Sequence, residues 1–344
     1  MWWKAQKDPP VVSSLKQRIR SEQKDYSSIN HSQAQGTEKD KIESIAMEDE
    51  RTRRTIDDHF QNAYYASQHI KFKYWAIMLS LGMANSSDAS EILCLSYLLS
   101  DEGFETNMLR SNASLLGGVL ASAVFFGMLL GGLVVGTMGD AMGRRPMLIM
   151  GLSLNAVAGI ASALAPNIFV MSFLRFVAGV GIGASVPPLF TLVTELSPPS
   201  HRGLFITICA SFWMIGSIYV ALVALFCFQF WYTGWRVFAL LSALPSAISV
   251  LFISNLAPES PRFLAVHNKH EEAVTVANYV TQSMDYHDDE LQLEDVLYHY
   301  PPAQQEQASL GHKSYWEEFV SSVGKLYMPS LTNTTIGLQI AWFG

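Results

Sequence analysis

Two carboxylates interrupt an otherwise apolar stretch of this chain. Asp88 and Glu91 stand three positions apart inside the run 74–99, a spacing that places both on one face of a helix. A charged side chain in hydrocarbon costs about 2.5–3.5 kcal/mol on insertion scales, so the pair has to face water or a partner. One interpretation is a proton- or cation-binding site that faces a central polar cavity. The alternative is a shifted helix with both carboxylates near the outer membrane interface.

A third charge and two aromatic residues are candidates for the same site. Arg175 lies early in the apolar run 168–194 and can pair with one of the carboxylates. Trp213 and Tyr219 lie in the run 204–230. An aromatic face attracts an organic cation, and a carboxylate pairs with its charge. Aromatic residues together with carboxylates favour an organic cation over a hexose as the solute, although aromatic residues in membrane helices more commonly serve packing.

A second group of charges gathers at the ends of the apolar runs. Its first part is the loop motif Gly136-Thr-Met-Gly-Asp140-Ala-Met-Gly143-Arg144-Arg145. The glycines permit a tight turn and close helix approach, and Asp140 can pair with Arg144 at the membrane face. The remaining members are Glu195, Arg202, Glu259 and Arg262. These charges either form ion pairs or anchor the helix ends at the interface.

Membrane-spanning helices must hold these residues in place. The chain is 49% hydrophobic and only 15% charged, and its apolar runs are about 20 residues long, enough to cross a core roughly 30 Å thick. Six helices are expected at about 74–99, 113–138, 147–165, 168–194, 204–230 and 237–256. The fold class is therefore an all-α membrane protein. Its expected parts are a cytosolic region 1–70, disordered and then helical, the six-helix bundle 71–263, a cytosolic loop with short helices 264–325, and the truncated start of a seventh helix 326–344.

The basic residues predict the orientation of this multi-pass protein. Arg144, Arg145, Arg202 and Arg262 all fall on one side of the six expected helices, together with Lys71 before the first one. Loops rich in Lys and Arg face the cytoplasm. The N-terminus and the segment after the sixth helix are therefore expected to be cytosolic, while the choice between plasma membrane and intracellular vesicle stays open.

The charged motifs resemble those of the major facilitator superfamily of transporters. The G-x-x-x-D-x-x-G-R-R loop is similar to the loop between helices 2 and 3 of that family, except that Ala141 stands where Arg or Lys is usual. Two segments resemble sugar-porter hallmarks: the run from Arg175 to Glu195 with Arg202 seven residues later, and Pro258-Glu259-Ser260-Pro261-Arg262. Four more look like the synaptic vesicle glycoprotein 2 branch: Asp88-Ala-Ser-Glu91, Phe212-Trp-Met-Ile-Gly216, Gly234-Trp-Arg-Val-Phe238 and Asn268-Lys-His-Glu-Glu-Ala273.

This resemblance implies twelve helices in two related halves, with the solute site between the halves near the bilayer midplane. The chain would supply the N-terminal half and the start of helix 7. The resemblance further implies that the acidic pair and Arg175 serve proton coupling. It also implies that the cytoplasmic charges form ion pairs that hold the two halves in the outward-facing state, and partners from the second half would be missing here.

Two functions of different class are compatible with these features. The first is a secondary transporter, present as a half-length chain, that moves an organic cation or sugar-like solute with proton or cation coupling. The alternative is a transport-inactive membrane protein that acts as a vesicle or membrane binding or trafficking partner. The sequence contains no recognisable Ser-His-Asp arrangement, metal-ligand cluster or phosphate-binding loop, so no enzyme, cofactor, metal or nucleic-acid partner is expected. The expected partners are the lipid bilayer, a small solute and protons, and the oligomeric state is left open.

Overall fold

The computed structural model describes most of the chain between residues 54 and 302. The described ranges are 54–67, 72–109, 113–230, 234–287 and 290–302, together with residues 324, 328, 332–334 and 336–337. Within helices, the side chains of residues 113, 134–141 and 230 are not described. The region before residue 54 and most of the expected seventh helix, 326–344, lie outside the described residues.

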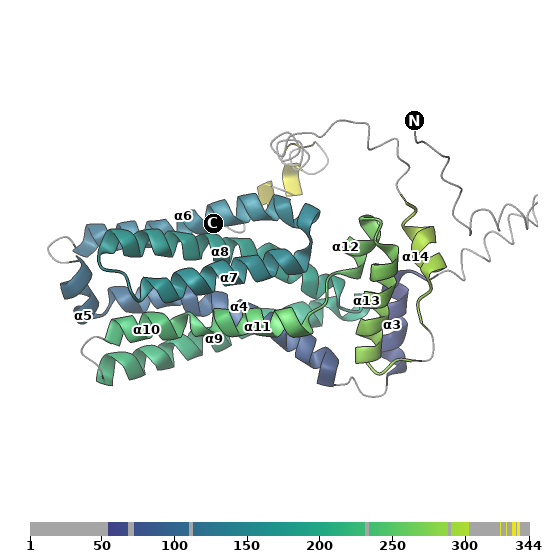
Figure 1. Cartoon of the computed structure of the whole chain (residues 1–344), viewed down its shortest axis with the longest axis horizontal. Helices are drawn as coiled ribbons and strands as arrows, with labels where there is room; N and C mark the ends of the chain where they lie inside the picture. Colours follow the sequence, from purple (N-terminus) through teal and green to yellow (C-terminus); the bar gives the residue numbers. More distant parts are fainter. Residues whose placement is uncertain are drawn as a thin grey trace, which may run out of the picture. The chain divides into compact units, whose positions relative to one another are not determined.

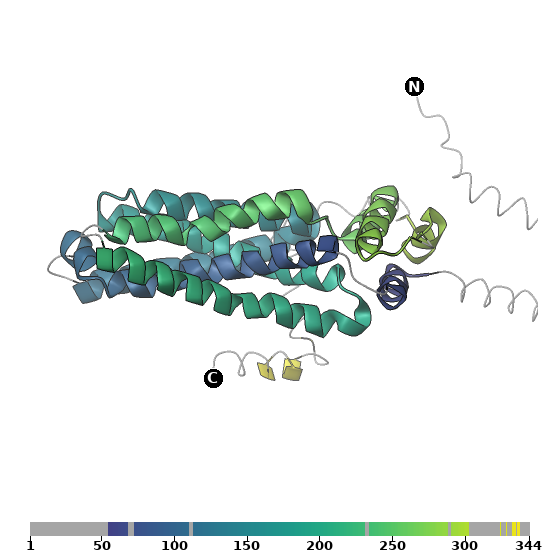
Figure 2. The same cartoon turned by 90° about the horizontal axis from the view of Figure 1, so that it is seen from below.

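The described part of the chain is built from helices and contains no strand. In chain order they are α3 (Ile56–Ala66), α4 (Phe72–Leu99), α5 (Glu102–Phe104), the π-helix η2 (Glu105–Leu109), α6 (Ala113–Met142), α7 (Arg144–Ser162), α8 (Ile168–Glu195), the 3-10 helix η4 (Pro199–His201), α9 (Arg202–Phe230), α10 (Gly234–Ser242), α11 (Leu244–Leu256), α12 (Pro261–Val266), α13 (His270–Ser283) and α14 (Leu293–His299). The long helices form a bundle, with α3, α12, α13 and α14 at one end and α5 at the other (Figures 1 and 2). These are called the α12 end and the α5 end below.

Each of the six expected membrane helices has a counterpart, but two boundaries differ from expectation. Helix α6 continues to Met142 and α7 begins at Arg144, so the expected loop shrinks to Gly143. The φ angle of Gly143 is +104°, a conformation that glycine adopts at little cost. The expected sixth helix is divided at Ala243 into α10 and α11. Pro245 follows directly, and its ring clashes with the carbonyl four residues earlier, which favours a break at this point.

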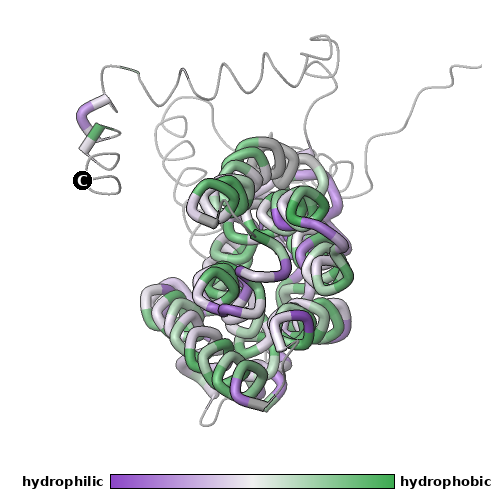
Figure 3. Tube along the Cα trace, turned by 90° about the vertical axis from the view of Figure 1, so that its left-hand side faces the viewer, coloured by the Kyte–Doolittle hydropathy of each residue, from purple (hydrophilic) through white to green (hydrophobic). Residues whose placement is uncertain are grey.

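Five described segments are long and apolar enough to cross a membrane: Ser114–Leu133, Arg144–Ser162, Ile168–Glu195, Pro199–Gln229 and Gly234–Leu256. Helix α4, expected as the first span, is not among them because polar residues dilute its middle: Asn85, Ser86, Ser87, Asp88, Ser90 and Glu91. All six are buried, and α4 packs against α8, α9, α10 and α11. Hydrophobic residues predominate along the bundle helices in Figure 3. The polar side chains of α4 therefore lie inside an apolar bundle.

Glycines set the close crossing of α6 and α8. A β-carbon on Gly127 would lie 2.2 Å from the Phe176 carbonyl oxygen, and one on Gly183 would lie 2.1 Å from the Met128 carbonyl oxygen. Real β-carbons do not approach backbone oxygens so closely, so the two backbones can touch only because both positions lack a side chain. Such small-residue contacts are the usual means of packing helices in a membrane, where no hydrophobic force drives them together.

An apolar core that continues from the bundle into the α12 end joins α3 to α13. Ile56, Phe60 and Ala63 of α3 are buried together with Ala273 and Ala277 of α13. The spacing of Ile56, Phe60 and Ala63 places them on one face of α3. Helix α3 is therefore docked through one apolar face.

Candidate functional site

Helix α4 places both carboxylates in the interior of the bundle. Asp88 is 0% exposed and Glu91 is 2% exposed, so neighbouring helices enclose both carboxylates. Glu91 is accommodated where α7 carries Gly159, because a β-carbon there would lie 2.9 Å from the Glu91 Oε1 atom. The two carboxylates share a helix but have different partners, and each forms a separate part of the candidate site.

Glu91 forms a buried ion pair with Arg175 of α8. The guanidinium Nη1 atom donates to Glu91 Oε1, and both side chains are 1% exposed. Nη2 donates to the Ser162 hydroxyl at 2.9 Å and lies 3.7 Å from the Cys94 sulfur. Removing two charges from water is expensive, and their mutual attraction together with these added contacts offsets that cost. The pair therefore ties α4 to α8, with Ser162 of α7 as a third contact.

Asp88 has no cationic partner among the described residues. Its Oδ2 atom lies 2.8 Å from the Ser185 hydroxyl of α8, and its Oδ1 atom makes no hydrogen bond there. The Ser185 oxygen also lies 2.8 Å from the Ile182 carbonyl oxygen. A hydroxyl has one hydrogen to donate, so Asp88 and Ile182 compete for it. The environment of Asp88 thus contains two acceptor groups for a single donated hydrogen.

The two aromatic candidates are not part of this polar interior. The Tyr219 hydroxyl donates to the Leu241 carbonyl oxygen at 2.9 Å. That carbonyl is the one four residues before Pro245, which has no N–H group to offer it. Trp213 lies on the outer surface of α9 and is 36% exposed. In the described part of the chain, neither side chain hydrogen-bonds to Asp88, Glu91 or Arg175, so the structure does not bring the aromatic and acidic candidates together.

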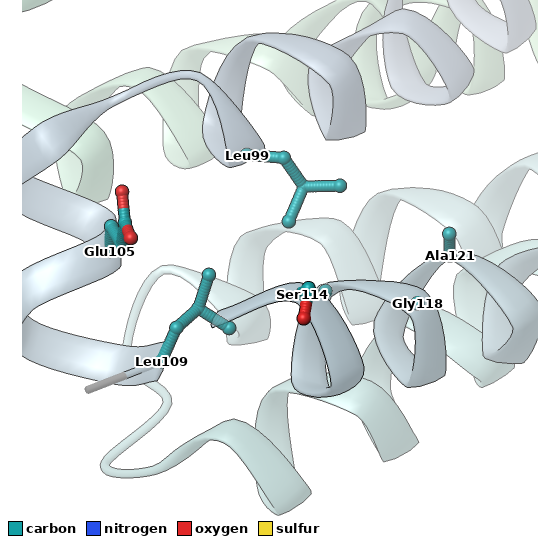
Figure 4. A pocket seen from close by; sticks show the side chains of 7 residues that line it. Leu99, Glu105, Leu109, Ser114, Gly118 and Ala121 are labelled. Atoms are coloured by element: carbon teal, nitrogen blue, oxygen red, sulfur yellow. The ribbon is translucent and has the colours of Figure 1, made fainter. Parts of the chain in front are cut away.

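Two cavities lie near the α5 end rather than at the carboxylates. One, of about 370 Å³, is lined by residues of α4, η2 and α6: Leu99, Glu105, Leu109, Ser114, Gly117, Gly118 and Ala121 (Figure 4). The other, of about 510 Å³, lies between Tyr97 of α4 and the last turns of α9. Asp88, Glu91 and Arg175 line neither of them.

Among the candidate charges at the α12 end, Glu259 is the cap of helix α7. Its Oε1 atom accepts the backbone N–H groups of Arg144 at 3.1 Å, Arg145 at 3.2 Å and Ser260 at 2.8 Å. A carboxylate at a helix N-terminus satisfies N–H groups that have no partner within the helix, and it also lies favourably in the field of the helix dipole. A β-carbon on Gly143 would lie 2.5 Å from Glu259 Oε2, so a larger residue there would displace this carboxylate in addition to straining the backbone at φ +104°.

The two arginines of the loop motif point to different neighbours. The Arg144 Nε atom lies 3.6 Å from Glu195 Oε2 at the end of α8, and its guanidinium lies 5.0 Å from the centre of the Phe263 ring. Arg145 donates through Nη2 to the Ser254 carbonyl oxygen of α11 at 2.7 Å. The motif therefore connects the start of α7 to α8, α11 and α12. Gly136 and Asp140 lie in α6, where the side chains of residues 134–141 are outside the described part.

Arg202 and Arg262 meet at one carboxylate that the sequence analysis did not identify. The Asp57 Oδ1 atom of α3 accepts Nη2 of Arg202 at 2.7 Å and also Nη2 of Arg262. Arg202 additionally donates through Nε to the Thr194 carbonyl oxygen at 3.2 Å. The Thr55-x-x-Asp58 spacing could have located the start of α3, because it forms a capping box. No local signal in the sequence connects Asp57 to the two distant arginines.

Comparison with known proteins supplies the family. Residues 58–343 match the sugar (and other) transporter family. The chain is 30% identical to synaptic vesicle glycoprotein 2A of Rattus norvegicus over 239 residues, which cover 66% of this chain and 31% of that protein. It is 32% identical to the Homo sapiens protein of the same name over 223 residues, covering 62% of this chain and 29% of that protein. The chain thus spans about a third of the length of these curated relatives.

Solved structures share the fold. The xylose transporter XylE from E. coli, in a partially occluded inward-open conformation, superimposes with a TM-score of 0.55 at 20% identity and covers 62% of this chain and 58% of its own. The expected all-α fold, the N-terminal half of a major facilitator protein, is confirmed by this match. Together with the family match, the glycoprotein 2 relatives confirm the resemblance drawn from the motifs. The chain belongs to the sugar (and other) transporter family, and its fold is that of the N-terminal half of a major facilitator protein.

Proposed function

We propose that the chain forms the proton-coupling part of a membrane transporter for a small organic solute, with Asp88 as the residue that takes up and releases the proton. The observation that carries this proposal is the surroundings of Asp88. Its carboxyl group is completely buried, has no cation beside it among the described residues, and has one oxygen without a hydrogen bond. An ionised carboxylate in such a place is expensive, whereas a protonated one is not.

The contacts of Ser185 support a neutral Asp88. If the Ser185 hydroxyl donates to the Ile182 carbonyl oxygen, the short 2.8 Å contact with Asp88 Oδ2 needs a hydrogen from the carboxyl group itself. A protonated Asp88 supplies that hydrogen. If Asp88 is ionised, Ser185 must turn its hydrogen from Ile182 to Asp88. The Ser185 hydroxyl of α8 would therefore change its hydrogen-bond partner when Asp88 of α4 gains or loses a proton.

Glu91 and Arg175 have a different role in this proposal. Because the two opposite charges neutralise each other, Glu91 stays ionised and does not compete with Asp88 for the coupling proton. The pair fixes α4 against α8 and keeps the titrating residue in position. Relocation of Arg175 toward Asp88 would stabilise the ionised form of Asp88, which would link the position of Arg175 to proton release.

The solute is proposed to be an organic cation or a sugar-like molecule, as the family name and the acidic residues suggest. The exposed Trp213 on α9 is a candidate for cation–π contact with an organic cation. The charged residues at the α12 end are proposed to control opening on that side, together with Gly143 at the turn between α6 and α7: Arg144, Arg145, Glu195, Arg202, Glu259 and Arg262. Within this chain they already pair across α7, α8, α9, α12 and α3.

The test is solute uptake into liposomes by the protein expressed from its complete coding sequence. The probes are tetraethylammonium and D-xylose, the latter because one structural neighbour is described as a proton:xylose symporter. We expect uptake of one probe to rise with an imposed pH gradient, and Asp88→Asn to abolish that dependence while the incorporated amount of protein stays unchanged. Glu271→Gln, a change at an exposed position of α13, serves as the control.

Two results would contradict the proposal. An Asp88→Asn variant with an unchanged pH profile would remove Asp88 from proton coupling. Absence of uptake and of pH-dependent proton flux in the parent protein with either probe would instead favour a transport-inactive membrane partner.

A further inference from the structure

Asp57 connects three segments that are far apart in the sequence. It lies in the first turn of α3, before the bundle begins, and its carboxylate accepts Arg202 at the start of α9 and Arg262 in α12. The three side chains are about equally accessible, with 26% to 32% exposed. A carboxylate shared by two guanidinium groups is a charge-assisted contact, stronger than a neutral hydrogen bond.

The backbone around Asp57 is held in place on both sides. Thr55 and Asp58 form a reciprocal capping box, in which the Asp58 N–H donates to the Thr55 hydroxyl at 3.0 Å and the Thr55 N–H donates to Asp58 Oδ2 at 3.1 Å. One turn later, Gln61 accepts the Ser200 backbone N–H at 2.9 Å and donates to the Ser200 hydroxyl at 2.7 Å. These contacts fix the first turn of α3 beside the η4 turn that precedes α9.

The opposite face of α3 is attached to α13. His59 is 1% exposed, and its Nε2 atom lies 3.1 Å from Asn278 Oδ1 and 3.2 Å from the Thr281 hydroxyl. Phe60 and Ala63 are fully buried in the apolar core of this end. Helix α3 therefore contacts the α8–α9 turn and α13 at the same time.

We infer that α3 is an integral bridge of the α12 end, in which Asp57 holds the start of α9 and helix α12 in one arrangement. The name Asp57 bridge is used here for Asp57 with Arg202 and Arg262. Helix α12 also carries Phe263, whose ring lies beside the Arg144 guanidinium, and it follows Glu259, the cap of α7. The Asp57 bridge therefore connects the charged residues at the ends of α7 and α8 to the start of α9. Any movement that separates the start of α9 from α12 has to break it. This inference concerns the fold and holds equally if the protein does not transport.

The test measures how often α3 opens away from the bundle. A cysteine is introduced at Ala63, a fully buried position of α3, and the rate of its modification by a small thiol reagent is followed in the detergent-solubilised whole chain. The native residues Cys94, Cys209 and Cys227 are buried and serve as an internal reference. We expect Asp57→Asn to raise the rate at position 63 at least about tenfold, because two charge-assisted contacts that resist local opening are lost.

Two controls make the result specific. Glu271→Gln removes a neighbouring acidic charge from an exposed part of α13 and should leave the rate unchanged. If Asp57→Asn does not yield folded protein, the rate is measured in Arg262→Gln, which leaves Asp57 paired with Arg202, and a smaller increase is expected. An unchanged rate in folded Asp57→Asn, or in folded Arg262→Gln, would overturn the inference and leave α3 held by its apolar packing and its other hydrogen bonds.

Discussion

At the scale of single residues, the interior of the bundle separates two kinds of carboxyl group. Glu91 has a charge partner in Arg175, whereas Asp88 has only a hydroxyl neighbour, and each carboxyl group has one oxygen without a hydrogen bond among the described residues. A buried charge that has a partner helps to hold the two helices in place, because its removal leaves the other charge buried without a partner. An unpaired one is suited to change its protonation state. Two carboxyl groups on the same helix face therefore have different surroundings.

The Glu91–Arg175 pair provides a prediction at this scale. Arg175→Gln leaves the Glu91 carboxylate without a cation and should lower the free energy of unfolding by about 3–5 kcal/mol, the usual effect of removing one partner of a buried pair. Glu91→Gln should be comparably destabilising, since it isolates the guanidinium. The double variant should lose clearly less than the sum of the two, because no charge is then left unpaired. Unfolding of the purified protein in detergent measures all three, and strictly additive losses would mean that the pair has no energetic coupling.

How far the sequence predicts the site depends on the type of residue. Asp88, Glu91 and Arg175 could be singled out because a charge in an apolar run needs an explanation. Ser162 and Ser185 could not, because small hydroxyl residues occur throughout these helices and only the packing of α7 and α8 against α4 gives them a role. Which carboxylate takes Arg175 was likewise left open, since spacing along one helix says nothing about the register of another.

At the scale of helices, the absence of side chains decides how α6 and α8 cross. A β-carbon on Gly179 would lie 2.2 Å from the Val124 carbonyl oxygen, while one on Gly118 of the same helix pair would meet nothing within 4 Å. The two positions therefore offer a matched comparison of one extra methyl group.

We expect Gly179→Ala to lower stability by about 1–3 kcal/mol, because the added carbon has to push α8 away from the α6 backbone. Gly118→Ala should leave stability unchanged or raise it slightly, since alanine is the better helix former and has free space there. Thermal unfolding of the two variants in the same detergent checks the difference. Equal melting temperatures would show that this crossing tolerates separation.

The sequence predicts which segments form helices, whereas it does not predict where those helices end. Apolar length located the bundle helices, because a segment must be long and apolar to cross hydrocarbon. The α6–α7 boundary depends on Glu259, which caps α7 from a distant part of the chain, and no local pattern indicates that contact. Pro245 lies beside the break between α10 and α11, yet Pro187 and Pro188 lie within an uninterrupted α8. Tertiary packing decides which prolines break a helix.

At the scale of the whole molecule, burial is uneven among the bundle helices. Only 22% of the apolar window of α9 and 28% of that of α6 are buried, compared with 56% for α8. The wide exposed faces of α6 and α9 are apolar, as expected for helices that meet lipid or further protein in the membrane. By contrast, the polar residues of α4 are enclosed. The bundle thus keeps these polar groups inside a mainly apolar core and presents apolar faces on the outside.

The two ends of the bundle should face opposite sides of the membrane. Because Lys and Arg gather at the α12 end, we predict that this end is cytosolic. A cysteine at Glu272, on the exposed surface of α13, should resist an impermeant thiol reagent in intact cells and react once digitonin opens the plasma membrane. A cysteine at the exposed Thr106 in η2 should react in intact cells if the protein lies in the plasma membrane. It should react only after full detergent treatment if the protein lies in an intracellular vesicle. Labelling at position 272 in intact cells, or protection there after digitonin, would show that the protein has the opposite orientation. It would also place the Asp57 bridge on the non-cytosolic side.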